Sequence, residues 1–221
     1  MLIKFFNDPT RFIKLISLLM SGVGMTLAIF ALTLIISLPL GILTALGRMS
    51  KKQVIRFPVS FYIYIMRSTP LMLRVMCIYF LLPQILPFKL DRFWAVIFAF
   101  VINYAAYFAE IFRGGIQAVP LGQREAGQVL GYTRIQVFVR IVMPQVIKNV
   151  MPSVTNEVIT LVKDTALAST VSITEIMIIA KQQVSASSSV EPYLLAMGIY
   201  LILNGIASQL CKRIEKKLGY Y

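Results

Sequence analysis

The chain has 221 residues, of which 58% are hydrophobic and 14% are charged. Soluble domains carry about a quarter of their residues as charged side chains, so this chain lacks the polar surface that a soluble fold needs. Its net charge of +13 is spread between apolar runs instead of along one face, which indicates membrane orientation and argues against nucleic acid as a partner.

The chain also lacks the residues on which many metal and haem sites depend. It has no histidine, and its two cysteines, Cys77 and Cys211, are far apart and form no CxxC pair. Zinc, haem and histidine-based acid–base chemistry therefore lose their usual ligands. We interpret both cysteines as packing residues.

The N-terminal residues 1–16 mix basic side chains, such as Lys4, Arg11 and Lys14, with aromatic and aliphatic ones. This composition is typical of a helix that lies in the membrane interface. From Leu15 to Gly47 no charged residue occurs. That run is far longer than the roughly 7 to 15 residues of a signal-peptide core, so it predicts a retained membrane anchor.

Crossing a bilayer as a helix takes about 20 apolar residues. Five stretches meet this requirement, at 18–46, 57–86, 93–112, 150–167 and 193–210. The fourth contains Glu157, Lys163 and Asp164 and is the weakest of the five in hydropathy. A further apolar segment, 169–180, is too short to span and holds Glu175, so we expect it to be re-entrant or interfacial.

The distribution of basic residues tests this count, because each span changes the side of every later loop. With five spans, 13 of the 22 basic residues fall on one side, six fall on the other and three lie within spans. The richer side is the cytoplasm by the positive-inside rule. We expect an all-α integral membrane protein of about five spans, with the N-terminus outside, the C-terminus cytoplasmic, and one membrane domain over residues 17–218.

The segment between the third and fourth spans, about 113–149, is too polar to face lipid. Pro120 and Gly122 interrupt the chain, a short helix is predicted over 123–130, and Gly131 supplies a second break because glycine accepts unusual backbone angles. After Gly131 the apolar residues recur near helical spacing and predict an amphipathic second helix. They are Ile135, Val137, Phe138, Ile141 and Val142.

One face of that second helix can lie against the membrane bundle. Glu125 and the small residues Ala126 and Gly127 would then be exposed on the first helix, where another protein can close over them. The spacing Glu125-Ala126-Gly127, then Gly131, then IVMP ending at Pro144 closely resembles the EAA loop of permease subunits in ATP-binding-cassette importers.

Two other segments resemble the polar-amino-acid branch of that family: RSTPLMLRVMCIYFLLP from Arg67 and NEVITLVKDTALAST from Asn156. The resemblance covers about residues 17–218. Gly127 replaces the second alanine of the motif and Met143 replaces the leucine before Pro144. Both replacements are small or apolar, so we expect docking to be preserved.

The resemblance implies the type I importer permease fold and a division of labour among several proteins. It assigns Glu125, Ala126, Gly127, Gly131 and Pro144 to coupling with a dimer of cytoplasmic ATPases. The chain has no G-x-x-x-x-G-K-[ST] loop, so ATP and Mg would be bound by that partner, with no cofactor in this chain. An extracytoplasmic amino-acid-binding protein and a second permease chain, identical or related, complete the expected importer in a bacterial cell membrane.

Ionisable residues at membrane depth are costly and by default mark pathways or sites. Arg67 and Arg74 are seven residues apart, and Glu157 and Asp164 repeat this spacing, so each pair is expected to share a helical face. A zwitterionic amino acid needs a cation for its carboxylate and an anion for its ammonium group. The candidate substrate-pathway residues are Arg67, Arg74, Asn103, Glu157, Lys163 and Asp164.

A structural role competes with this hypothesis, because Arg67 and the Lys163–Asp164 pair match family features regardless of substrate. Arg74 differs, since family members commonly have glutamine there, and is the best candidate for a selectivity residue. A second arginine beside the pathway favours a carboxylate-rich or neutral substrate. Glu110 is a further pathway candidate, whereas ordinary helix packing explains Asn103 equally well.

Two other function classes compete with the permease subunit. An ion-coupled secondary amino-acid transporter would need no ATPase but usually shows paired repeats with broken helices, and no such repeat is seen. A membrane enzyme would need a HExxH motif, a Ser/His pair or a haem ligand set, which this sequence lacks. We therefore expect a transport subunit and no enzymatic activity.

Overall fold

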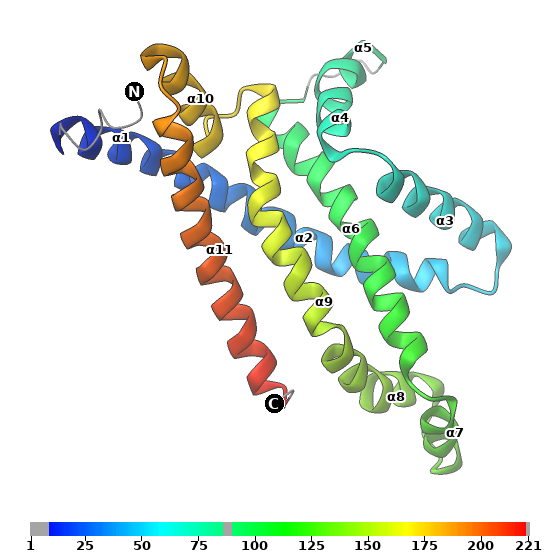
Figure 1. Cartoon of the computed structure of the whole chain (residues 1–221). Coiled ribbons are helices and arrows are strands. Elements are labelled where there is room, and N and C mark those ends of the chain that lie inside the picture. The colour runs from blue at the N-terminus through cyan, green and yellow to red at the C-terminus, as the bar shows by residue number, and fades with distance from the viewer. Residues whose placement is uncertain (1–8, 86–89, 220–221) are drawn as a thin grey trace. The chain divides into compact units, whose positions relative to one another are not determined.

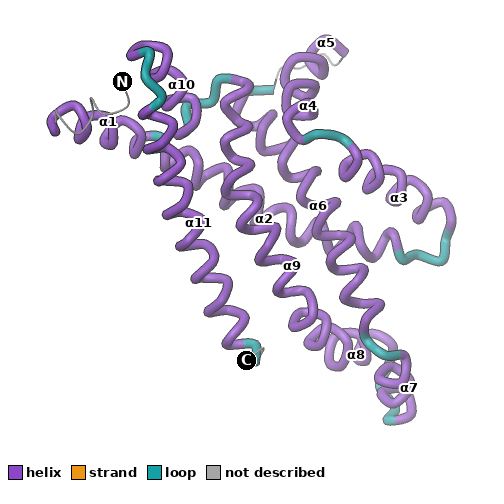
Figure 2. The backbone as a smooth tube through the Cα atoms, viewed as in Figure 1, coloured by secondary structure: helices purple, strands orange, loops and turns teal. Residues whose placement is uncertain are grey.

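The computed structural model describes residues 9–85 and 90–219, and within these ranges the chain forms only helices, turns and loops (Figure 2). Figure 1 follows the helices in chain order. They are α1 (Pro9–Ser21), α2 (Val23–Arg48), α3 (Gln53–Ser68), α4 (Leu71–Met76), α5 (Leu82–Ile85), α6 (Arg92–Ala118), α7 (Leu121–Val129), α8 (Arg134–Val137), α9 (Met143–Asp164), α10 (Ile176–Ser187) and α11 (Glu191–Lys217). The all-helical fold class is confirmed.

Shorter helical turns connect some of these elements. Two π-helical turns, Cys77–Leu81 and Phe138–Val142, precede α5 and α9, and a 3₁₀ turn, Thr165–Val171, follows α9. Each π turn comes just before a proline, Pro83 or Pro144. Proline has no N–H to donate and its ring crowds the preceding turn, so a wider turn relieves the conflict.

The chain divides into two compact units, each built from three separate segments. Unit 1 comprises Met1–Ile35, Thr69–Val101 and Ile159–Ala207, and unit 2 comprises Ile36–Ser68, Ile102–Val158 and Ser208–Tyr221. The long helices α2, α6, α9 and α11 each run through both units.

In unit 1, apolar residues of α1 and α10, among them Leu15, Leu19 and Ile176, form one buried cluster. Glu175 begins α10, because its carboxylate accepts hydrogen bonds from the backbone N–H groups of Met177 and Ile178. It also accepts a hydrogen bond of 2.8 Å from the hydroxyl of Tyr200 on α11. A buried carboxylate is costly unless its oxygens are satisfied, and these three donors satisfy it.

In unit 2, glycines allow α6 to approach its neighbours closely. A Cβ at Gly41 of α2 would lie 2.6 Å from the Cβ of Phe108, and one at Gly115 would lie 2.2 Å from Cγ1 of Val150 on α9. Both distances are too short for real atoms, so each contact requires glycine. A hydrogen bond of 2.5 Å from Thr155 to the carboxylate of Glu215 joins α9 to α11.

Within residues 9–85 and 90–219, three helical stretches are long and apolar enough to cross a membrane: Thr10–Arg48, Arg92–Ala118 and Glu191–Lys217. The interrupted pair Gln53–Ser68 and Leu71–Ile85 gives a fourth if it is counted as one span. The first, third and fifth predicted spans lie within Thr10–Arg48, Arg92–Ala118 and Glu191–Lys217, respectively. The second lies within the interrupted pair, apart from Thr69 and Pro70 at the break and Leu86, which is outside the described residues.

The fourth predicted span, 150–167, lies on α9 and the 3₁₀ turn that follows it. Although α9 has 22 residues, it does not meet the same test of length and apolarity, and it carries Glu157, Lys163 and Asp164. The count of five spans and their orientation stay predictions.

Two shorter segments were also assigned from the sequence. The part of the predicted interfacial segment that is described lies in α1, and residues 1–8 are outside the described ranges. Segment 169–180 contains the end of the 3₁₀ turn, a left-handed residue at Ser172 with φ 60°, and the start of α10. This interruption fits the prediction that the segment is not a sixth spanning helix.

The expectation that Arg67 and Arg74 share a helical face is wrong. Helix α3 ends at Ser68, and α4 begins at Leu71 after Pro70, whose φ of −65° and ψ of 134° are extended. Because a proline disfavours helical geometry in the preceding residue, the chain leaves the helix at Thr69. Two-turn spacing therefore does not relate the two arginines.

The close contact at Gly115 gives a stability prediction with a neighbouring control. We expect Gly115→Ala to destabilise the protein by about 1 to 3 kcal/mol, because the new methyl group would overlap the buried Val150. Gly114→Ala meets nothing within 4 Å and should be neutral or stabilising, since alanine favours helix. Thermal unfolding of both purified variants in detergent measures the difference, and equal midpoints would contradict the packing argument.

Candidate functional site

The segment between α6 and α9, in unit 2, forms two short helices joined by a tight turn, as the sequence predicts. Helix α7 starts at Leu121, two residues earlier than expected, because extended Pro120 precedes it and Gly122 is helical. The guanidinium of Arg124 donates a hydrogen bond of 2.8 Å to the carbonyl of Ile116, which ties α7 to the end of α6.

The turn after α7 is fixed by backbone and side-chain hydrogen bonds. Gly131 has a φ of +82°, a left-handed conformation that glycine adopts without strain. The N–H of Tyr132 donates to the carbonyl of Gly127, and that of Gly131 donates to Gln128, as in a Schellman motif. The sequence prediction of a break at Gly131 is confirmed.

The next helix, α8, begins with a reciprocal capping box. The hydroxyl of Thr133 accepts a hydrogen bond from the N–H of Gln136, while the side chain of Gln136 accepts one from the N–H of Thr133. These bonds satisfy two N–H groups that a helix start otherwise leaves open. Both ends of the turn are therefore set by local sequence.

Gly127 is buried, which corrects the expectation that it is exposed. A Cβ at this position would lie 2.6 Å from Cδ1 of Ile141 and 2.9 Å from Cγ2 of Val137. The glycine thus lets α7 pack directly on the following helix. Glu125 and Ala126 are exposed, as expected.

The helix that follows is amphipathic, as predicted, with Val137, Val142 and Val146 buried along one side. Ile135 departs from the predicted apolar face, because its side chain is exposed. The π-helical turn lies between α8 and α9, and Pro144, exposed, follows it in the first turn of α9.

The exposed side of this loop combines one carboxylate with several large apolar side chains. Glu125 takes part in none of the ion pairs found within residues 9–85 and 90–219. The exposed apolar side chains are Leu121, Val129, Leu130, Ile135 and Val139. Large apolar side chains exposed on a polar loop are typical of a protein-binding surface.

A second polar feature of unit 2 centres on Glu110 of α6. Its carboxylate lies 2.6 Å from Nε of Arg48, the last residue of α2, and 2.8 Å from an NH group of Arg113. Arg67 of α3 lies at 3.8 Å, with its guanidinium 5.6 Å from the ring centre of Tyr107. We call Glu110, Arg48, Arg67 and Arg113 the Glu110 cluster.

The sequence indicates only part of this cluster. Arg67 and Glu110 are separate pathway candidates in the sequence, whereas Arg48 and Arg113 are not among the predicted site residues. The i,i+3 spacing of Glu110 and Arg113 was a local signal for one ion pair. The convergence of α2, α3 and α6 on one carboxylate had no signal in the sequence.

The other pathway candidates are distributed over both units. In unit 2, Asn103 is buried, and its Oδ1 has no hydrogen-bond partner within the described part of the chain. In unit 1, the guanidinium of Arg74 donates a hydrogen bond of 2.9 Å to the carbonyl of Thr69. Glu157 and Asp164 are partly buried and both helical, seven residues apart on α9, so they share a face.

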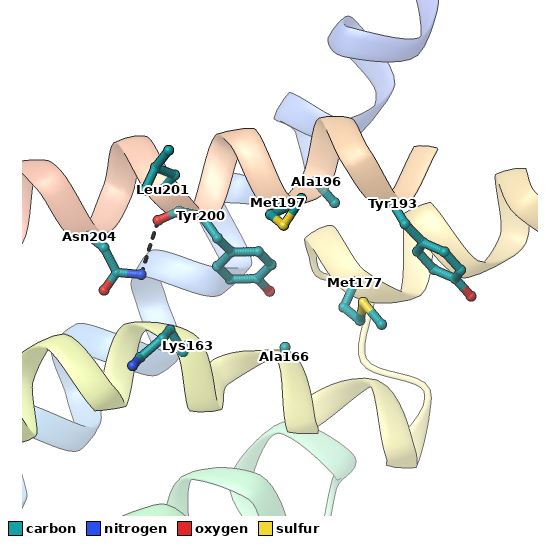
Figure 3. A pocket seen from close by; sticks show the side chains of 9 residues that line it. All are labelled: Lys163, Ala166, Met177, Tyr193, Ala196, Met197, Tyr200, Leu201 and Asn204. Carbon is teal, nitrogen blue, oxygen red and sulfur yellow. Dashed lines mark hydrogen bonds between the residues drawn. The ribbon is translucent and has the colours of Figure 1, made fainter. Parts of the chain in front are cut away.

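Lys163 of α9 borders a hollow of about 460 Å³ in unit 1. Figure 3 shows it opposite Tyr200 and Asn204 of α11, where Asn204 donates a hydrogen bond of 3.1 Å to the carbonyl of Tyr200. The remaining lining is largely apolar and includes Met177 and Met197. A polar amino acid would find few hydrogen-bond partners there, so this hollow is a poor candidate for its binding.

Comparison with known proteins adds three findings to this geometry. The chain is 37% identical over 212 residues to the arginine transport system permease protein ArtQ of Bacillus subtilis (strain 168), covering 96% of this chain and 97% of that protein. It is 41% identical to the octopine transport system permease protein OccM of Rhizobium radiobacter, covering 94% and 89%. A crystal structure of an amino acid ABC transporter with histidines matches with a TM-score of 0.86 and 34% identity, covering 95% and 98%.

The family match covers most of the chain and includes the two-helix loop. Residues 37–220 match the family described as the binding-protein-dependent transport system inner membrane component. The chain therefore belongs to this family of inner-membrane transport components.

Proposed function

We propose that the chain forms the membrane pathway of an importer for a polar amino acid or a related compound, and that an ATPase docks on α7. Family membership makes it a transport component of the inner membrane and not an enzyme. A binding protein and an ATPase are its partners, and nucleotide is bound by the ATPase. The names of the arginine and octopine permeases support the substrate class.

The observation that carries the coupling role is the construction of α7. A docking helix that passes on movement must be held firmly at both ends, and α7 is held by Arg124 at its start and by the Gly131 turn at its end. Gly127 packs the helix onto Val137 and Ile141, so a push on α7 is transmitted to the helix that continues into α9.

The exposed surface of the loop suits a groove in another protein. Glu125 supplies one charge for orientation, while Leu121, Val129 and Leu130 supply apolar area that is unfavourable in water. Ala126 is small and exposed, so a partner can approach the helix closely there. We assign Glu125 and Ala126 to contact, and Gly127, Gly131 and Pro144 to shaping the loop.

Glu157 and Asp164 of α9 are proposed as substrate-pathway residues. Either carboxylate can bind an ammonium or guanidinium group, and a guanidinium such as that of Arg74 can bind a carboxylate. Asn103 adds a buried amide oxygen without a donor. Arg67 is left out, because its guanidinium already contacts Glu110 and Tyr107. Lys163 is left out because it borders an apolar hollow.

A second permease chain, identical or related, is proposed to complete the pathway. One helix face can line only one side of a passage, so the remaining sides need other surfaces. Residues 17–218 would act as one permease domain, since α2, α6, α9 and α11 each run through both compact units.

The proposed contact between Glu125 and the ATPase can be tested by reversing the charge of this residue. We expect Glu125→Arg to reduce the ATPase activity stimulated by the binding protein and substrate at least about tenfold, the scale on which a close charge pair in an interface acts. Gln123→Ala is the control. Gln123 is also exposed on α7 but lies on the opposite side of the helix from Glu125, so this variant should retain activity. Full stimulation of the Glu125→Arg transporter in proteoliposomes would refute the contact.

Substitutions at Gly131 test the effect of backbone strain alone, because a Cβ at this position would meet nothing within 4 Å. Alanine at a left-handed position costs about 1 to 2 kcal/mol, whereas asparagine tolerates this conformation. We expect Gly131→Ala to weaken coupled ATP hydrolysis and uptake while Gly131→Asn retains both. If the Gly131→Ala transporter hydrolyses ATP and transports normally, the loop is not the coupling element.

Arg74 is the proposed selectivity residue. We expect Arg74→Gln to change the preference between a carboxylate-rich and a cationic amino acid by about tenfold or more, because a charge-assisted hydrogen bond contributes about 1.5 to 3 kcal/mol. Arg74→Lys keeps the charge and should change the preference less. Competition between the two substrates for uptake measures this ratio, and an unchanged ratio in Arg74→Gln would exclude the role.

A further inference from the structure

The Glu110 cluster carries more positive than negative charge. Three arginines surround one carboxylate, so two positive charges are left without a counter-charge among these four side chains. Arg48 and Arg113 are largely shielded, with 29% of each side chain exposed, and Glu110 is 13% exposed. Partly buried charges of one sign repel each other and attract an ion of the opposite sign.

A hollow of about 350 Å³ lies beside this cluster in unit 2. Arg48, Arg67 and Glu110 form its charged side. Hydroxyl groups from Ser60, Ser68, Tyr64 and Tyr107 complete its polar lining. Hydroxyl and guanidinium groups together donate the hydrogen bonds that a phosphate group accepts.

Arg67 is the arginine best placed to bind an additional ion. Its contact with Glu110 is long, at 3.8 Å, and 47% of its side chain is exposed. A guanidinium has five N–H donors, and one long contact leaves most of them for a ligand. The ring of Tyr107, 5.6 Å from the guanidinium, holds the arginine beside the hollow.

From this combination we infer that the hollow beside Glu110 binds the phosphate group of an anionic lipid. The position favours a lipid over free phosphate, because Arg48 ends one spanning helix and Arg113 lies near the end of another. Lipid headgroups lie at the ends of spans, and basic pockets between membrane helices bind them.

Helix α3 supplies the second indication of a lipid. Its exposed aromatic residues Phe57, Phe61 and Tyr64 lie four and three residues apart and so follow one side of the helix. Aromatic side chains gather where hydrocarbon meets headgroups. The sorting of basic residues predicts that this end of the spans is on the cytoplasmic side, where anionic lipids attract basic segments.

The test uses the purified transporter complex in a neutral detergent. Phosphatidylglycerol, phosphatidylcholine and inorganic phosphate are titrated separately, and the thermal unfolding midpoint is recorded. We expect a saturable rise with phosphatidylglycerol and little change with the other two. A rise with inorganic phosphate alone at millimolar concentration would overturn the lipid as the source, and no saturable rise with any of the three would overturn the site.

Variants locate the effect within the molecule. Arg67→Gln should raise the half-saturating phosphatidylglycerol fraction about fivefold, since a basic residue near anionic lipid contributes about 1 kcal/mol. Arg56→Gln removes the same charge from an exposed position of α3 outside the hollow and should behave as wild type. Equal weakening in both variants would show non-specific attraction to a basic surface and refute the site.

If the Arg67→Gln transporter does not assemble, Arg67→Lys, which keeps the positive charge, provides a second test. Lysine still binds phosphate as a point charge but cannot form the forked contact of a guanidinium. Arg67→Lys should therefore weaken phosphatidylglycerol binding by less than the fivefold expected for glutamine, while Arg56→Lys leaves it unchanged. If Arg67→Lys and Arg56→Lys bind identically to wild type, the forked contact is absent and the assignment fails.

Discussion

The hydrocarbon core of a bilayer offers no hydrogen-bond partners, and this constraint governs the whole chain. Each backbone N–H and C=O inside the membrane must be satisfied within the protein, which an α-helix does by itself. The described residues obey this rule by forming helices joined by short turns. Every departure from regular helix, such as the break at Pro70 or the π turn before Pro144, then needs a local cause.

Since lipid tails are as apolar as the helices, packing between membrane helices depends on close fit and on polar contacts. In unit 2, Gly41 and Gly115 provide the close fit and Glu110 provides the polar contact. In unit 1 the polar contact is made by the carboxylate of Glu175, which accepts hydrogen bonds at the start of α10 and from Tyr200 of α11. In each unit, polar atoms that would be costly in lipid are paired with one another and so hold neighbouring helices together.

The two-helix loop differs from the rest because it does not depend on lipid. Its shape follows from local sequence, since Pro120, Gly131 and the Thr133–Gln136 capping box each set one end of a helix. Such a loop can keep its shape when a partner exerts force on it. The Glu110 cluster has a different origin, because two of its three arginines, Arg48 and Arg67, come from helices far from α6 in the sequence.

The sequence by itself determined the features that depend on local or periodic patterns. Apolar length predicted the helical stretches that are long and apolar enough to cross a membrane, and Gly131 predicted the turn between the two loop helices. The coupling role that the Glu125 motif suggests stays a proposal. Tertiary structure decided what depends on distant contacts: the burial of Gly127 against Ile141 and the convergence on Glu110. The break that separates Arg67 from Arg74 has a local cause, Pro70, which the seven-residue spacing did not take into account. The physical reason is that hydropathy and backbone preference act over a few residues, whereas packing joins side chains whose separation in sequence carries no signal.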